Sequence, residues 1–156
     1  MTMPDLQPMN TFAHRFGPGV DLKQAMAALL RLRGTRAAVI LGAVGSLDGV
    51  HLRYADRDTP TALAGRWEIL SLSGTLGPDG MHVHLAVSDG EGQCRGGHLV
   101  DGCRVYTTAE IVFGEFPGLL FARRPDPATG YLELVVEADP SVSPTGSARP
   151  RPGPAP

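Results

Sequence analysis

Long apolar runs are absent from this sequence. Its 156 residues contain no stretch of about 18 apolar residues, which is the length that a helix needs to span a bilayer. The first ten residues, MTMPDLQPMN, contain neither the basic nor the apolar part of a secretory signal. We therefore expect a soluble, cytoplasmic protein. The length is about that of one domain and suffices to bury a hydrophobic core.

Cysteine is scarce, with only Cys94 and Cys103 in the chain. The local pattern places both on one strand or its continuation, and their spacing of nine residues is odd. Because alternate side chains of a strand point to opposite faces, the two thiols are expected to face apart. A disulfide between them would not meet the geometry that such a bond requires, so both are expected to be reduced.

Lysine is almost missing, since Lys23 is the only one, and the net charge is -2 with a pI of about 6.2. This charge offers no positive field to attract phosphate backbones, so composition does not predict generic nucleic-acid binding. The sequence also lacks the glycine-rich phosphate loops of nucleotide-binding proteins and the Gly-x-Ser-x-Gly turn of serine hydrolases. Those two classes are therefore excluded.

One helix is expected, and it begins after Asp21. This aspartate is a suitable N-cap, and Gln24 three residues later completes a capping box. Gly34 suits the C-terminal end of the helix. Between the two ends, apolar residues recur at helical spacing, at Leu22, Ala25, Met26 and Leu29. The helix is expected to cover one face of a sheet.

Strands are predicted where short apolar or alternating segments lie between turn residues. Residues 36–43 form a continuous apolar run that is too short for a helix, so we expect a central strand buried on both faces. Residues 45–49 are expected to form a turn, and residues 55–64 a polar loop. The predicted strands cover residues 11–16, 36–43, 50–54, 67–75, 81–88, 93–100, 104–115, 119–123 and 131–137. One helix against many strands predicts an α+β fold with a mainly antiparallel sheet.

Both ends of the chain are expected to lie outside the folded domain, which we place at residues 11–137. Residues 1–10 are polar and punctuated by proline, and we expect them to be flexible. Residues 138–156 contain six prolines and almost no large apolar side chains. Such a segment cannot offset the entropy cost of ordering, so it is expected to be disordered.

Three of the five histidines lie close together between residues 81 and 100. His82 and His84 alternate on a predicted strand, so they point to the same side, roughly 7 Å apart at Cα. A single metal ion can bridge that gap. If the following strand returns as a hairpin, His98 comes into reach of both.

The length of the hairpin loop decides whether the three imidazoles converge. A three-residue loop at 90–92 would set Asp89 against Gln93 and place His84 directly opposite His98. A two-residue turn would shift the register by one residue and send His98 to the other face of the sheet. The prediction of a metal site therefore depends on this loop.

Simpler interpretations remain open for the same residues. A histidine pair on a strand is more often solvated or hydrogen-bonded than a pair of metal ligands, although a third histidine favours the metal site. Gly96 and Gly97 fit a close approach of backbone or ligand to His98, and they fit a plain β-bulge equally well. The other two histidines, His14 and His51, have no partner at useful spacing and are expected at the surface.

Four motifs, taken in order, resemble the plants-and-prokaryotes-conserved (PPC) domain family. They are Pro18-Gly19-Val20-Asp21-Leu22, Gly42-Ala43-Val44-Gly45-Ser46-Leu47, Gly65-Arg66-Trp67-Glu68-Ile69-Leu70-Ser71-Leu72-Ser73-Gly74 and Gly96-Gly97-His98-Leu99. The resemblance covers about residues 12–123. It implies an antiparallel sheet with a packed helix, assembled as a homotrimer.

Plant members of the family carry a separate DNA-binding AT-hook before this domain, and this sequence lacks one. An AT-hook needs a Gly-Arg-Pro core flanked by basic residues to lie in a narrow minor groove. The nearest segment, residues 148–154, has neither that order nor sufficient charge. A DNA-binding function for this chain would therefore rest on family analogy alone.

The bacterial version of the domain carries histidines where His82, His84 and His98 stand here. Their arrangement is similar to the three-histidine metal site of acetolactate decarboxylase, whose fold resembles this one. The resemblance implies a divalent metal, with Zn²⁺ as the expected ion, that could polarise an oxygen of a small 2-oxo or 2-hydroxy acid. The candidate proton carriers are Glu68 and Glu110, and the candidate partners of a substrate carboxylate are Arg15, Arg53 and Arg66. Alternation alone would place Glu68 on the solvent side of its strand.

Two functions follow from these observations. The first is a regulatory binding module, described as DNA-binding by family resemblance, in which the metal is structural or holds a small effector. The second is a metal-dependent, lyase-like enzyme for small oxo acids. A structural site would be closed by a fourth protein ligand, whereas an enzyme needs an open coordination position and nearby acid and base groups.

Overall fold

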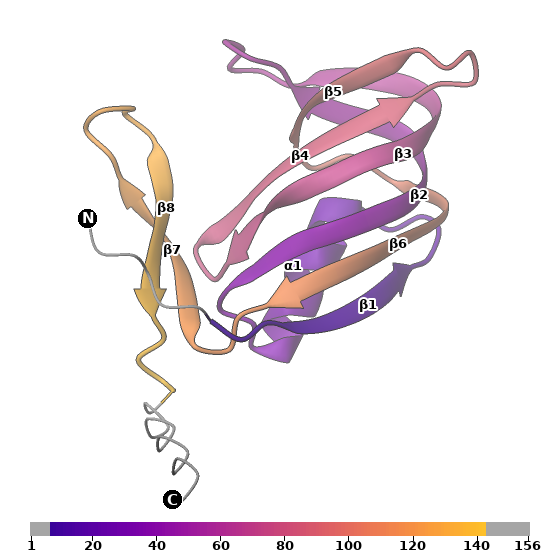
Figure 1. Cartoon of the computed structure of the whole chain (residues 1–156). Coiled ribbons are helices and arrows are strands. Elements are labelled where there is room, and N and C mark those ends of the chain that lie inside the picture. Colours follow the sequence, from indigo (N-terminus) through magenta and orange to yellow (C-terminus); the bar gives the residue numbers. More distant parts are fainter. Residues whose placement is uncertain (1–6, 143–156) are drawn as a thin grey trace, which may run out of the picture.

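The protein folds around one six-stranded antiparallel sheet (Figure 1). The structure is a computed structural model and describes residues 7–142. Within that range it has one helix and eight strands, namely β1 (Asn10–Phe16), α1 (Leu22–Arg33), β2 (Ala38–Arg53), β3 (Thr61–Gly77), β4 (Gly80–Ser88), β5 (Cys94–Leu99), β6 (Val105–Glu115), β7 (Leu119–Pro125) and β8 (Leu132–Ala138). The strand order in the main sheet is β1-β6-β2-β3-β4-β5. The predicted α+β class with a mainly antiparallel sheet is confirmed.

The sheet closes on itself at one end. The C-terminal end of β2 pairs with β5 as well as with β3, through Leu52 opposite Leu99 and Arg53 opposite His98. Strands β2, β3, β4 and β5 therefore form a small barrel-like unit, and β6 and β1 extend the sheet from β2. This closure brings the end of β2 next to the histidine hairpin.

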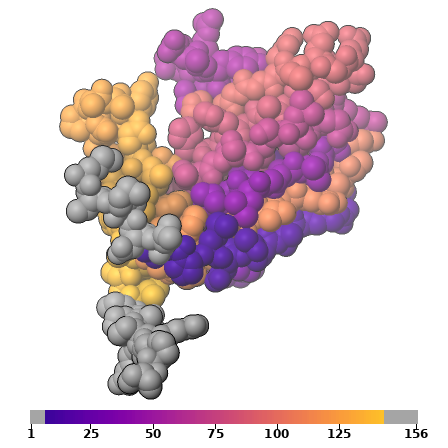
Figure 2. Space-filling view, in the orientation of Figure 1, coloured from indigo at the N-terminus to yellow at the C-terminus, as the bar shows by residue number. Residues whose placement is uncertain are grey.

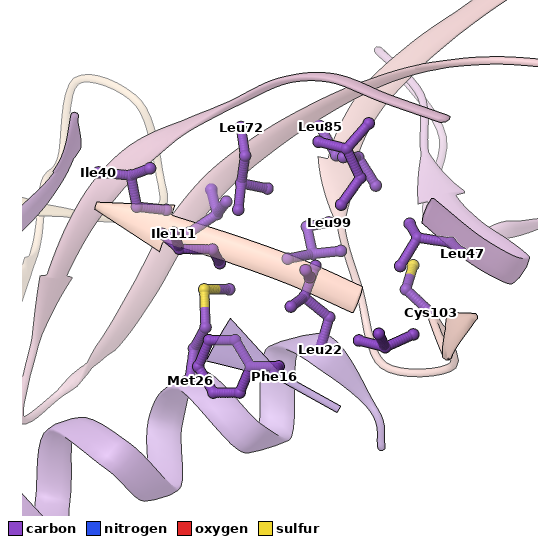
Figure 3. Packing of buried hydrophobic residues seen from close by; sticks show 14 of the residues in the cluster. Phe16, Leu22, Met26, Ile40, Leu47, Leu72, Leu85, Leu99, Cys103 and Ile111 are labelled. Atoms are coloured by element: carbon purple, nitrogen blue, oxygen red, sulfur yellow. The ribbon is translucent and has the colours of Figure 1, made fainter. Parts of the chain in front are cut away.

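Helix α1 forms where the sequence predicts it. The Asp21 carboxylate accepts a hydrogen bond from the backbone N–H of Gln24 at 3.0 Å, and Gly34 ends the helix in the left-handed conformation with φ 70°. Leu22 and Met26 are fully buried against the sheet. Figure 3 shows them pointing toward core residues of the strands, among them Ile111 and Leu99. The helix thus covers one face of the sheet and leaves the other, which we call the outer face, without a covering element in the described chain (Figure 1).

Strand β2 is central, as predicted, but the expected turn at residues 45–49 is wrong. The strand runs on through this segment to Arg53, and the pairing register shifts at two places, between Gly45 and Leu47 and between Asp48 and Val50. Gly45 and Gly49 have φ of 141° and 80°. Glycine accepts such angles in a β-bulge as readily as in a turn, so the glycines bend the strand without reversing it.

The expectation that residues 36–43 are buried on both faces is also wrong. Ala38 and Ile40 lie in the core, but Leu41 is 49% exposed on the outer face. Val44, beyond the predicted segment, is 59% exposed on the same face. A continuous apolar run normally marks a strand covered on both sides. Within a single chain, the outer side of this strand has no cover.

Strands β7 and β8 form a separate two-stranded sheet that stands beside the main one (Figures 1 and 2). Its base is fastened by two contacts. The N–H of Phe121 donates to the carbonyl of Arg36 at 3.0 Å, and the Arg36 Nε lies 3.1 Å from the buried carboxylate of Asp139. Ordered contacts therefore continue past the expected domain boundary at residue 137. Most of the expected tail, residues 143–156, and residues 1–6 of the expected flexible N-terminus lie outside the described part.

Both cysteines are unpaired, as expected, but not for the predicted reason. Cys94 begins β5, whereas Cys103 lies after it, in the connection to β6. Cys103 is fully buried, and burial raises the pKa of its thiol to about 11. His51 is half-buried and donates its backbone N–H to that sulfur at 3.2 Å, so it is not the fully surface residue that was expected. His14 is exposed, as predicted. In residues 7–142, no helix has the length and apolar character to cross a membrane.

A glycine in β3 controls how closely β4 can approach. A Cβ atom at Gly74 would press against the backbone of His82 and Val83. Gly74→Ala is therefore expected to lower the free energy of unfolding by about 1–3 kcal/mol, because the two strands must separate. Gly17→Ala is the control, because nothing lies near its Cβ position, and it should change the free energy by less than about 0.5 kcal/mol. Urea unfolding measures both, and equal stabilities for the two variants would contradict this close packing.

Candidate metal centre

The β4–β5 hairpin has the three-residue loop on which the metal prediction depends. The N–H of Asp89 donates to the carbonyl of Gln93 at 3.1 Å, and the Asp89 carboxylate accepts the N–H of Gln93 at 2.8 Å. Gly92 completes the loop with a φ of 80°. The ladder begins with Ser88 opposite Cys94. Four residue pairs further along, His84 lies directly opposite His98. The predicted register is confirmed.

The three imidazole rings converge on the outer face of the sheet. His82, His84 and His98, which we call the three-histidine cluster, each have a ring nitrogen within 4.8 Å of those of the other two. The ring centroids are 5.0 Å apart for His82 and His84, 4.9 Å for His82 and His98, and 4.5 Å for His84 and His98. The Nε2 atoms of the two rings on β4 are 3.3 Å apart.

These distances suit a tetrahedral metal site. Zn–N bonds of about 2.0–2.1 Å place neighbouring ligand nitrogens about 3.3–3.4 Å apart. The His82–His84 pair already has that separation, and the same distance also suits an N–H···N hydrogen bond between neutral rings. Among the residues that the structure describes, no carboxylate or thiol joins the three rings as a fourth donor. An ion held here would therefore keep a coordination position open.

The surroundings favour neutral imidazoles, which is the form that binds metals. Burial lowers the pKa of His82 below the ordinary histidine value, and the charges of His84 and Arg123 act in the same direction, while Glu133 opposes them. Burial also lowers the pKa of His98, with a further contribution from Arg53. Both rings are thus more readily deprotonated than a free histidine.

One of the three predicted arginines lies beside the cluster. Arg53 is the β2 partner of His98, and His98 is in turn the partner of His84, so these three residues form a row across β2, β5 and β4. Side chains in such a row share one face and lie about 4.5–5.5 Å apart at Cβ. The glycine next to His98 permits this arrangement, because a Cβ on Gly97 would lie 2.9 Å from the carbonyl oxygen of Arg53. The sequence-based link between this glycine and a close backbone approach is therefore confirmed.

A cavity of about 730 Å³ opens next to the cluster. The last β4–β5 pair is His84 and His98, so residues 80–83 of β4 continue past β5 and leave a gap where the strands diverge. His82 and His98 line one side of this cavity, and Arg53 lies with them. Residues of the β7–β8 hairpin line another side, namely Arg123, Tyr131, Leu132 and Glu133.

The structure does not bring the two predicted proton carriers to the cluster. Glu68 pairs with Ser88, at the far end of β4 from His82. Glu110 lies on β6 and pairs with Val44 of β2. Both are exposed on the outer face, and neither lines the cavity.

The remaining predicted arginines also lie elsewhere. The Arg15 Nε donates to the Thr108 hydroxyl at 2.9 Å, and the Arg66 guanidinium stacks on the ring of Tyr106 at 4.0 Å. Neither lines the cavity. Arg123, which does, was missed by sequence reasoning because it lies on a hairpin outside the main sheet. Its place beside His82 depends on tertiary contacts, among them a hydrogen bond to the Thr75 hydroxyl at 2.7 Å, and strand periodicity carries no signal for such contacts.

Both the sequence and the fold of this chain are similar to those of known proteins. Residues 3–117 match the sequence model of the Plants and Prokaryotes Conserved (PCC) domain. A bifunctional protein GlmU from Synechococcus sp. (strain JA-2-3B'a(2-13)) is 53% identical over 123 residues, which cover 79% of this chain and 20% of that protein. This chain spans about a fifth of the length of the GlmU relatives that it matches.

Two solved structures superpose closely on this one. A hypothetical protein from Salmonella enterica has 42% sequence identity and a TM-score of 0.84, with 86% of this chain and 97% of that chain covered. The metal-containing protein AF0104 from Archaeoglobus fulgidus has 26% identity and a TM-score of 0.71, with 85% of this chain and 99% of that chain covered. With its motifs, its antiparallel sheet and the match over residues 3–117 all in agreement, this chain belongs to the Plants and Prokaryotes Conserved domain family, abbreviated PCC or PPC.

Proposed function

We propose that this protein is a binding module that holds a divalent cation, Zn²⁺, at its three-histidine cluster and presents an open coordination position to a ligand. The convergence of three ring nitrogens within 4.8 Å carries this proposal. Neutral imidazoles in a tetrahedral arrangement suit Zn²⁺, and three protein ligands with one free position are typical of zinc sites that bind a further molecule. The structural similarity to a metal-containing archaeal protein supports metal binding by this fold.

The positions of the glutamates favour a binding module over a lyase-like enzyme. Such an enzyme needs an acid or base within hydrogen-bond reach of the substrate. Glu68 and Glu110, the two candidates for that role, lie away from the cluster. Neither predicted proton carrier can therefore act at the cluster, and we propose binding, with a regulatory role for the bound ligand, as the function of the open position.

Charge argues against direct contact with DNA by a single chain. The net charge of -2 gives no basic surface of the kind that phosphate contacts require. A regulatory role at DNA, as the family resemblance implies, would therefore act through a partner that supplies the basic residues.

The assembly that we propose is a homotrimer in which the outer face of the sheet meets other copies. Large apolar side chains on β2, β3 and β6 are exposed there by 41–59%, namely Leu41, Val44, Leu70 and Val112. Exposed apolar side chains that gather on one face mark a protein interface more often than free surface. The apolar run in β2, typical of a strand covered on both sides, supports this assembly.

Removing one histidine should remove the metal. In untagged protein purified with Zn²⁺, His84→Ala should reduce the bound metal from about one ion per chain to almost none, because His84 contacts both other rings. His14→Ala is the matched control, since His14 is exposed on β1 and outside the cluster. Elemental analysis measures the occupancy, and full occupancy in the His84 variant would overturn the proposed site.

Metal affinity should fall in acid. Protons compete with Zn²⁺ for the imidazoles, so the affinity is expected to drop more than about ten-fold between pH 7.5 and pH 5. The pKa of His82 and of His98 is lowered in the folded protein, so the metal-free fold should also lose stability as the pH falls below about 6.5. Competition with a zinc-binding dye at each pH gives the affinity. An affinity that does not change with pH would be incompatible with imidazole ligands.

The assembly can be tested on β2. Light scattering should give a mass of about 50 kDa, three times the 16.5 kDa of one chain. Val44→Arg should shift this mass toward that of the single chain, because burying the charge at an interface is costly. The single chain should still fold, because Glu110, the β6 partner of residue 44, can pair with the arginine. Leu32→Arg is the control, since Leu32 is 87% exposed on α1. A trimer that survives the Val44 change would place the interface elsewhere.

A further inference from the structure

The cavity beside the three-histidine cluster contains two guanidinium groups, from Arg53 and Arg123, that have no acidic partner. Within residues 7–142, neither group lies within 4 Å of a carboxylate. Other cations near the cavity are paired, Lys23 with Asp101 at 3.5 Å and Arg124 with a carboxylate on the β3–β4 turn at 3.0 Å. The two arginines are therefore available to a ligand.

The guanidinium of Arg53 is available because its own chain holds it only weakly. Arg53 is half-buried beside His98, its β2–β5 pairing partner. Its one side-chain hydrogen bond goes to the carbonyl of Arg57 and is long, at 3.5 Å. A ligand at the cluster can thus take up most of its donors.

Arg123 approaches the cluster from the opposite side. Its Nη2 donates to the Thr75 hydroxyl at 2.7 Å, and Thr75 is the β3 partner of His82. Its backbone N–H donates to the carboxylate of Asp79 at 3.1 Å, which fixes the start of the side chain. The guanidinium is therefore held next to His82 while several of its five donors remain unused.

The charge in this cavity becomes more positive once a divalent metal is bound. Three neutral imidazoles leave the full charge of a divalent ion, and the two guanidinium groups add to it. Two lining carboxylates, Asp56 and Glu133, oppose these charges, while Asp79 is already paired with Arg124. Charges of this kind, in a partly buried site, favour an anion that can contact metal and guanidinium together.

We infer that the open position of the metal takes a small oxyanion, either a carboxylate or a phosphate, held by Arg53 and Arg123. One oxygen would bind the ion, and the other oxygens would accept hydrogen bonds from the guanidinium groups, in the geometry that arginine forms with carboxylates and phosphates. A cavity of about 730 Å³ is of the size that accommodates a small organic molecule. Tyr131 and Leu132 supply an apolar wall for the rest of such a ligand.

This inference rests on the proposed metal site, and Co²⁺ can test the two separately. Co²⁺ bound to three histidines absorbs visible light, and its spectrum changes when an anion enters the coordination sphere. Titration of the Co²⁺-loaded protein with acetate, pyruvate or inorganic phosphate should give a saturable change below about 10 mM for at least one of them. The anion that saturates at the lowest concentration identifies the ligand class as carboxylate or phosphate.

Substitution of the arginines then assigns the binding. Arg53→Gln and Arg123→Gln should each lower the affinity for the anion by roughly ten- to a hundred-fold while leaving the Co²⁺ stoichiometry unchanged. Arg66→Gln is the matched control, because Arg66 stacks on Tyr106 away from the cavity, and it should bind anions like the original protein. Arg53→Gln carries the test if the Arg123 variant is unstable, since Arg53 supports no other element.

The possible failures are distinct. A protein that binds Co²⁺ stoichiometrically but shows no spectral change with any of the three anions overturns the anion site and leaves the metal site intact. Equal anion affinity in the Arg53 and Arg66 variants likewise overturns the role of Arg53. A protein that does not bind Co²⁺ at all overturns both the metal site and the inference built on it.

Discussion

The register between β4 and β5 determines the chemistry of this protein. The same alternation that turns Leu85 and Leu99 into the core turns His84 and His98 outward, so the hydrophobic core and the three-histidine cluster require the same pairing. A register shift of one residue in β5 would expose Leu99 and bury His98 at the same time. The Asp89 carboxylate, which caps the three-residue loop, fixes the register from the other end. The cluster is thus held by the stability of the fold and needs no dedicated support.

The pairing of β5 with β2 places a cation beside the three-histidine cluster. A hairpin alone would present three neutral rings to solvent, whereas the pairing of His98 with Arg53 adds a cation to the same face. Gly97 makes the close approach possible, because any larger residue would collide with the β2 backbone. On the other side, the hydrogen bond between Thr75 and Arg123 adds a second cation. The histidine cluster and the two arginines therefore occupy neighbouring positions across four strands.

Local signals predicted much of this arrangement, and tertiary contacts account for the rest. The helix cap at Asp21, the helix end at Gly34 and the hairpin register each depend on residues close together in the sequence. All three predictions are confirmed. The turn expected at residues 45–49 was wrong because a glycine at positive φ bends a strand as readily as it reverses one. Glu68 and Glu110 were chosen by residue type, and alternation cannot tell how far along the sheet a side chain lies from the cluster. Arg123 could not be found because its hairpin forms a separate sheet.

The three histidines and part of the cavity lining lie on two separate sheets, which can change independently in evolution. The three-histidine cluster lies on the main sheet, within the segment that matches the family, whereas Arg123 and the apolar wall of the cavity lie on the β7–β8 hairpin beyond it. The hairpin is fastened at its base through Phe121 and the Arg36–Asp139 ion pair, and further along β7 through the contacts of Arg123 and Arg124. The rest of the hairpin, which includes Tyr131 and Leu132, can therefore accumulate substitutions without disturbing the histidine cluster or the core. Descendants of one ancestral domain could in this way come to recognise different small molecules through substitutions in a single peripheral hairpin.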